Sequence, residues 1–86
     1  MKAWELMVLP GGLETKARST KRFIKVQTIE KAVKRLMSDK KWGRMLIKHK
    51  SGIITDTIGD NVFQLNEVPL SRVEAFIKTE GKEALI

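Results

Sequence analysis

The chain has 86 residues, a formal net charge of +7 and no cysteine. This length is sufficient for one domain, and the 42% hydrophobic residues favour a folded core although 31% of residues are charged. The lack of cysteine excludes disulfides and cysteine-ligated metal sites, and the apolar runs are shorter than the ~18 residues that indicate a membrane span. We therefore expect one domain over residues 1–86, in the cytoplasm, without metal or cofactor.

The positive charge is concentrated in the first part of the chain. Residues 1–50 contain 14 Lys and Arg but only 4 Asp and Glu, a net charge of +10, whereas residues 51–86 carry a net charge of −3. Such asymmetry is typical of a protein with a basic surface for a polyanion and a separate, weakly acidic region. Charge that serves only solubility is the alternative explanation.

Two strands are expected before the first helix. Residues 3–9 alternate as in a buried strand, and the Pro-Gly-Gly that starts at Pro10 ends it. Residues 23–27 alternate again and predict a second strand. Residues 10–22 between them are polar and basic without a helical stripe, which predicts a mobile basic loop or, in part, a solvated strand end.

The first helix is the clearest element of the sequence. Thr28 is a typical N-cap, and Glu30 in the first turn suits the helix dipole. Apolar residues recur at helical spacing and form one stripe: Ile29, Ala32, Val33, Leu36 and Met37. Gly43 is expected just past the last turn.

The period then changes from helical to extended. Residues 44–50, 53–58 and 62–66 form three short segments separated by Ser51-Gly52 and by the turn that starts at Gly59. Turns of this length join neighbouring strands, so the pattern predicts a three-stranded antiparallel meander.

A second helix is expected near the C-terminal end. Ser71 and Glu74 have the spacing of a capping box, and Gly81 is expected to end the helix. The last residues, which include the apolar Leu85-Ile86, either dock on the domain or pack against a second subunit, so a homodimer stays open.

The resulting order of elements is ββαβββα. This order predicts an α+β fold, a single antiparallel sheet with two helices packed on one face.

The basic residues of the first half are the main candidates for a binding site. Phosphate contacts need many cations close together more than they need an exact motif. Glu30 and Asp39 are the only acids between residues 15 and 55, so neutralisation by acids cannot account for most of these cations. The predicted nucleic-acid-binding residues are Lys16, Arg18, Lys21, Arg22, Lys31, Lys34, Arg35, Lys41, Arg44, Lys48 and Lys50.

Three parts of this surface are expected. The four cations from Lys16 to Arg22 form an arm that orders on nucleic acid. Lys31, Lys34, Arg35 and Lys41 form the solvent face of the first helix. Arg44, Lys48 and Lys50 alternate along one strand and therefore share one of its faces.

Other candidate sites are less well supported. The Gly11-Gly12 loop lacks the spacing of a nucleotide-binding loop. The single histidine, His49, has no neighbouring base or metal partner for a nuclease. Trp4 and Trp42 could stack on bases, although a core position is the commoner fate of such residues. We expect no catalytic residue and no metal ligand.

These features predict a small basic nucleic-acid-binding protein without enzymatic activity, compatible with a phage or mobile-element accessory factor. DNA and RNA are not distinguished. The alternative is an adaptor or inhibitor whose basic face docks on an acidic surface of a host enzyme, such as a polymerase or nuclease.

Overall fold

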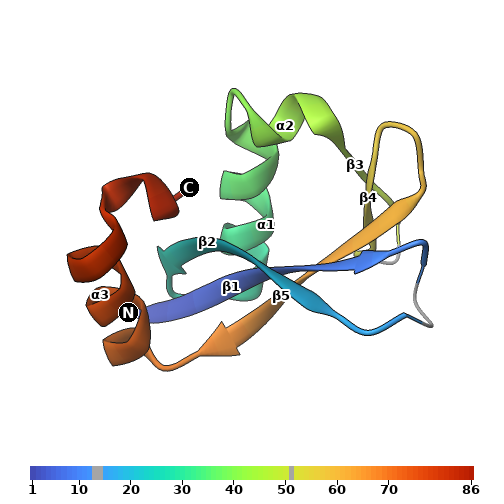
Figure 1. Ribbon diagram of the computed structural model, residues 1–86. Helices are drawn as coiled ribbons and strands as arrows, with labels where there is room; N and C mark the ends of the chain where they lie inside the picture. Colours follow the sequence, from blue (N-terminus) through green and yellow to red (C-terminus); the bar gives the residue numbers. More distant parts are fainter. Residues whose placement is uncertain (13–14, 51) are drawn as a thin grey trace.

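The computed structural model of the protein describes residues 1–12, 15–50 and 52–86. Five strands form one antiparallel sheet in the order β2-β1-β5-β4-β3 (Figure 1). The strands are β1 (Lys2–Pro10), β2 (Arg18–Val26), β3 (Leu46–Lys48), β4 (Ile54–Asp56) and β5 (Asn61–Val68). The helices are α1 (Ile29–Ser38), α2 (Trp42–Met45) and α3 (Leu70–Glu80), followed by the short 3₁₀ helix η1 (Lys82–Ala84). The predicted α+β class and the order of the main elements are confirmed.

Strand β1 is the centre of the sheet because it pairs with β2 on one side and with β5 on the other. Successive residues of a strand point to opposite faces. Trp4 pairs with Ile24, and the next pair, Ala3 with Lys25, faces the other way. Both faces of β1 bury apolar side chains, so both faces must be covered.

Helix α1 covers one face. Ala32 and Leu36 on its inner side are fully buried and pack in one cluster with Leu6 and Ile24 of the sheet. Trp4 belongs to the same cluster, where its indole Nε1 donates to the carbonyl oxygen of Val26 at 3.1 Å. The apolar stripe predicted from the sequence is therefore the stripe that forms this core.

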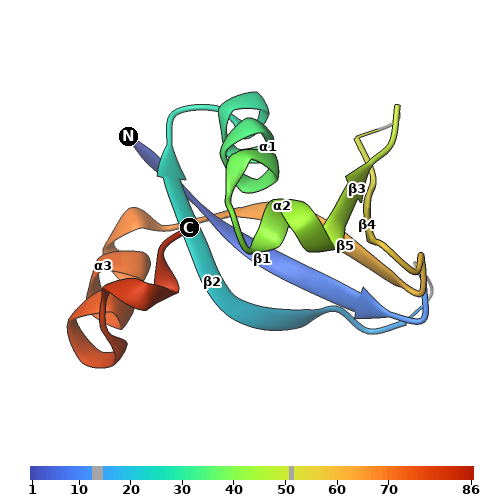
Figure 2. The same ribbon diagram turned by 90° about the horizontal axis from the view of Figure 1, so that it is seen from above.

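Helix α3 covers the opposite face. Its Val73 packs in a second cluster with Ala3, Phe23 and Ala84, and the Phe23 and Phe76 rings lie 5.1 Å apart. Figure 2 shows α1 and α3 on opposite sides of β1 and β2. The expected packing of both helices on one face is therefore replaced by a helix on each face, because β1 and β2 are apolar on both.

Helix α1 is shorter than expected. It ends at Ser38, and Gly43 lies inside a further short helix, α2. The Asp39 carboxylate stabilises the start of α2. Its Oδ2 accepts hydrogen bonds from the backbone N–H groups of Lys41 (3.0 Å) and Trp42 (2.9 Å). A side chain on Gly43 would collide with the carbonyl oxygen of Met37, so the glycine permits α2 to fold back on α1.

The three-stranded meander is confirmed, but β3 and β4 are shorter than predicted and β5 is longer. β3 pairs with β4 and β4 with β5, all antiparallel. Arg44 lies on α2 and Lys50 follows the end of β3. Gly59, at φ +81°, occupies the predicted second turn; Ser51 of the first turn lies outside the described residues.

Strand β2 begins earlier than expected. Residues 18–22 belong to it and are not part of a loop; of the predicted loop, residues 13–14 lie outside the described residues. Its register shifts opposite Leu6, and Lys21 has φ +59°. The Thr20 hydroxyl donates to the Leu6 carbonyl oxygen at 2.7 Å and accepts from the Arg22 N–H at 3.2 Å. Side-chain hydrogen bonds therefore hold this bulge in the strand.

The predicted capping box of the last helix is wrong. Pro69 occupies the N-cap position, no side chain caps the helix, and Ser71 lies in the first turn. Glu74 pairs instead with Lys25, at 3.8 Å. The ring of Pro69 restricts its own φ and so sets the direction in which the chain enters α3, although it offers no side-chain hydrogen-bond acceptor.

The C-terminal residues dock on the domain, as one of the two alternatives predicted. Gly81 ends α3 at φ +97°, and the Ile86 N–H donates to the Phe23 carbonyl oxygen at 2.9 Å. The tail thereby covers part of the outer edge of β2. In the described part of the chain, no helix combines the length and the apolar character needed to cross a membrane.

Two helix starts give a matched test of this fold. Thr28 Oγ1 accepts from the Lys31 N–H at 3.2 Å, so Thr28→Ala should lower the free energy of unfolding by about 1 kcal/mol. Ser71→Ala removes no cap and should change it by less than about 0.5 kcal/mol. Urea denaturation of both variants measures the difference. A larger loss for Ser71→Ala would contradict the assigned start of α3.

Candidate nucleic-acid interface

Five acidic side chains of the described residues form ion pairs or hydrogen bonds with other groups of the protein: Glu5, Asp39, Asp56, Glu67 and Glu74. Three ion pairs form among the described residues: Lys2–Glu67 at 3.7 Å, Lys25–Glu74 at 3.8 Å and Arg72–Glu5 at 3.7 Å. Glu5 is buried and also accepts from the Ser19 hydroxyl at 2.7 Å. Within the part of the chain described, none of the eleven predicted cations takes part in an ion pair.

Two further acids satisfy backbone groups. Asp39 caps α2, and Asp56 closes the turn between β4 and β5 by accepting from the N–H groups of Ile58, Gly59 and Asp60. Asn61 Nδ2 also donates to Asp56, at 2.7 Å. Partial burial acts to raise the pKa of Asp56, but the hydrogen bonds together outweigh it and place the pKa below its ordinary value of 3.8.

The first group of free cations lies on α1. Lys31, Lys34 and Arg35 are exposed on the helix side opposite the core. Positions three and four apart are neighbours on a helix surface, so the three charges form one compact group. We call this group the α1 basic face.

The α1 basic face borders two adjoining hollows beside the end of β2. One, of about 370 Å³, is lined by Val26, the three cations and Ser38. The other, of about 280 Å³, shares Val26, Lys31 and Arg35 with it and adds Met1, Lys25 and Gln27. Apart from Val26 and Met1, their linings consist of cations and polar groups without an acid, which favours an anion there, although Lys25 is already paired with Glu74.

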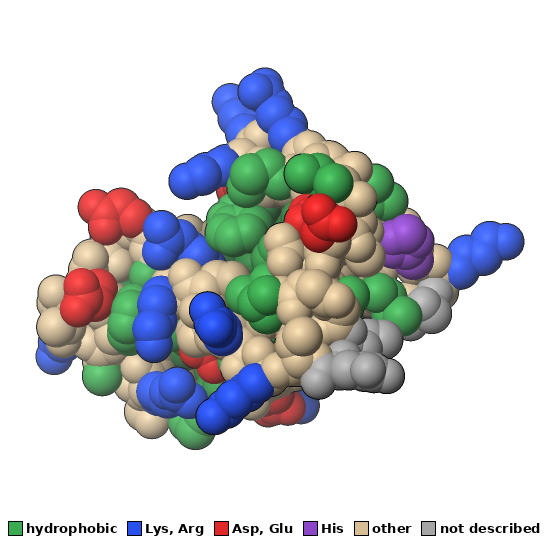
Figure 3. Space-filling view, turned by 45° about the vertical axis from the view of Figure 1, so that its right-hand side comes forward, with side chains coloured by type: hydrophobic (Ala, Val, Ile, Leu, Met, Phe, Trp, Pro, Cys, Tyr) green, Lys and Arg blue, Asp and Glu red, His purple; other side chains and the backbone are tan. Residues whose placement is uncertain are grey.

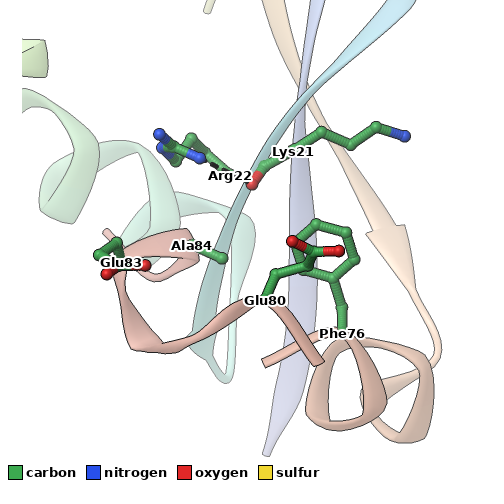
Figure 4. A pocket seen from close by; sticks show the side chains of 6 residues that line it. All are labelled: Lys21, Arg22, Phe76, Glu80, Glu83 and Ala84. Carbon is green, nitrogen blue, oxygen red and sulfur yellow. Dashed lines mark hydrogen bonds between the residues drawn. The ribbon is translucent and has the colours of Figure 1, made fainter. Parts of the chain in front are cut away.

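The second group lies on the edge strand β2. Arg18 and Lys21 are exposed, Arg22 is half-buried, and the bulge directs Lys21 and Arg22 to opposite sides of the strand (Figure 4). Arg22 Nη1 donates to the Lys21 carbonyl oxygen at 3.2 Å. A hollow of about 340 Å³ lies beside them, but Glu80 and Glu83 also line it. The opposing charges make this hollow a weaker anion site than those beside Val26.

The remaining predicted cations are exposed at separate places. Lys41 directly precedes α2, and Arg44 lies within it. Lys48 and Lys50 lie at the β3–β4 hairpin, and Lys16 lies before β2. The expected shared strand face of Arg44, Lys48 and Lys50 is therefore wrong, and so is the expected position of Lys41 on the first helix, because α1 ends at Ser38. Figure 3 shows Lys and Arg in groups at the top, at the right-hand edge and at the lower left of that view, not in one continuous stripe.

Sequence reasoning missed three residues of the hollows: Lys25, Gln27 and Ser38. Lys25 was assigned only to the second strand, and Ser38 was not considered. Their closeness to Lys31 follows from how α1 returns over β2, and no local pattern carries that information.

The other candidates have structural partners. His49 Nε2 lies 2.9 Å from Thr55 Oγ1. Within residues 1–12, 15–50 and 52–86, no group of three His, Asp or Glu side chains is placed to hold a metal ion. Comparison with protein-family models, curated proteins and solved structures finds no match.

The Asp56 turn gives a pH-dependent prediction. Because its folded pKa is lowered, the charged carboxylate stabilises the fold above its unfolded pKa, and this contribution disappears as the pH falls through the folded pKa. Asp56→Asn should therefore lower the thermal midpoint near neutral pH and lose this effect in strong acid. Thermal melts of both proteins across that range measure it. An equal difference at every pH would contradict the role of the charge.

Proposed function

We propose that this protein binds nucleic acid, mainly through contacts of Lys and Arg with the phosphate backbone. One observation supports the proposal most directly: acids of the fold pair with Lys2, Lys25 and Arg72, whereas the eleven candidate cations, like Lys40, Lys78 and Lys82, have no ion-pair partner among the described residues. Repulsion among unpaired like charges disfavours the compact state, and a polyanion relieves it by releasing counterions.

Protection of sheet edges explains only some of these charges. Lys and Arg on an exposed edge strand discourage pairing with another chain, which accounts for Arg18 and Lys21 on β2 and is one role of Lys48 on β3, which also borders a hollow beside α1. The α1 basic face is not on a sheet edge, and its hollows contain no acid. This group is therefore the part of the surface that favours a polyanionic ligand.

A salt titration tests the proposal. Binding to fluorescent DNA and RNA should weaken steeply with added salt, with a slope of log K against log salt of about −0.7 to −0.9 for each phosphate neutralised. Poly-glutamate of similar charge serves as the control for an acidic protein surface and should bind more weakly. Weak binding of nucleic acid at low salt, or tighter binding of poly-glutamate, would contradict the proposal and favour the adaptor alternative.

Single-charge variants refine the same measurement. Lys34→Gln on the α1 basic face should reduce the steepness of the slope by about 0.7 to 0.9, the loss of one phosphate contact. Lys78→Gln, an exposed position on α3, removes the same charge outside the proposed surface and should leave the slope nearly unchanged. Equal effects of the two variants would show that only net charge matters.

A further inference from the structure

All five aromatic side chains of the protein are engaged in packing. Trp4 and Phe23 are buried, with relative exposures of 7% and 2%. Phe76 packs on Phe23, and Trp42 packs edge-on against Phe63 with ring centroids 6.2 Å apart. Phe63, Phe76 and Trp42 are half-buried. No ring stands free beside the α1 basic face or lines its hollows.

This arrangement bears on the form of the nucleic acid. Proteins that bind single strands combine a basic groove with aromatic rings on which bases stack, and each stacked base contributes about 1–3 kcal/mol. Here Val26 lines both hollows and Met1 lines one of them, and the other lining residues are cationic or polar. A single strand would gain phosphate contacts but no stacking. A duplex loses nothing, because its bases already stack on one another.

The placement of cations around α1 also suits two strands. Lys31 and Arg35 are about 6 Å apart along the helix axis and border the hollow beside β2. Lys48 borders a separate hollow, of about 270 Å³, on another side of the same helix, lined also by Ile29, Glu30, Val33 and Gly52. The two hollows share no residue, so cations border two flanks of α1: Lys31 and Arg35 on one, and Lys48 of β3, beside Glu30, on the other. The phosphates of a DNA duplex likewise lie on both sides of its major groove, whose width of about 12 Å admits an α-helix.

We propose that the preferred ligand is duplex nucleic acid, held through the phosphates of both strands by cations on the two flanks of α1. The inference rests on the proposed function and adds the form of the ligand to it. Specific base recognition is not part of it, because phosphate contacts fix position without reading sequence.

Matched ligands test the preference. A labelled duplex of about 20 base pairs, roughly 68 Å long at 3.4 Å per pair, exceeds the 33 Å longest dimension of the protein. Its two separated strands, each chosen to lack internal pairing, provide the comparison at equal salt. The duplex should bind at least about tenfold more tightly than either strand, which corresponds to ~1.4 kcal/mol.

Paired variants test the two flanks. Lys31→Gln with Arg35→Gln should reduce the steepness of the duplex salt slope by about 1.8, and Lys48→Gln should reduce it by about 0.9. Lys78→Gln with Lys82→Gln removes two charges from α3 and η1, outside the flanks, and serves as the matched control. Circular dichroism confirms that each variant is folded.

The outcomes separate this inference from the proposed function. Tighter binding of the duplex, with loss in both flank variants and not in the control, supports it. Equal or tighter binding of the single strands overturns the duplex inference and leaves nucleic-acid binding in place. An unchanged slope for Lys48→Gln overturns the two-flank arrangement. Absence of binding to either form overturns the proposed function itself.

Discussion

Strands β1 and β2 bury apolar side chains on both of their faces, and the rest of the structure follows from this constraint. Trp4 and Leu6 face α1, whereas Ala3 and Phe23 face α3 and the C-terminal tail. A sheet that is apolar on both sides needs a layer on each side. The protein supplies one helix for each layer, and the two helices differ in charge.

This difference decides which charges are neutralised. On the α3 side, Glu74 pairs with Lys25 and Arg72 pairs with Glu5, so the layer and the sheet compensate each other. On the α1 side, the basic face of the helix points away from the sheet and has no acidic neighbour in its hollows. The net charge of the first fifty residues is thereby concentrated on one side of the sheet and at its edges. Such a distribution favours a polyanion and gives a physical basis for the proposed function.

Local sequence patterns predicted most helices and strands. The features that were not predicted depend on long-range packing. The stripe through Ala32 and Leu36 and the turn at Gly59 were readable because period and turn chemistry are local. The alternation of β1 was also predictable from the sequence. The packing of α3 on the second face of the sheet was not, because it depends on tertiary contacts that no local pattern encodes. The strand start at Arg18 was only one of two alternatives, because the hydroxyl-bearing residues Ser19 and Thr20 are also typical of loops; in the structure their hydroxyls form hydrogen bonds at the bulge.

The candidate site divides in the same way. The cations of α1 share one face because helical spacing fixes their neighbours, and the structure brings them together. Arg44 and Lys48 were expected on one strand, but Asp39 and Gly43 turn the chain into α2 first. Lys25 joined the hollows only through tertiary contact. Site residues that are neighbours on one helix were therefore predictable. Site residues that are brought together by tertiary contacts between separate elements were not.

The central claim is that the cations around α1 contact the ligand while the compensated α3 side does not. Amide chemical shifts recorded during titration with a short duplex test it most directly. The account predicts that shifts concentrate at Val26, at Lys31 to Ser38 and at Lys48, with little change along α3. Shifts concentrated on α3, or on the sheet face opposite α1 at Ile47 and Val62, would contradict it.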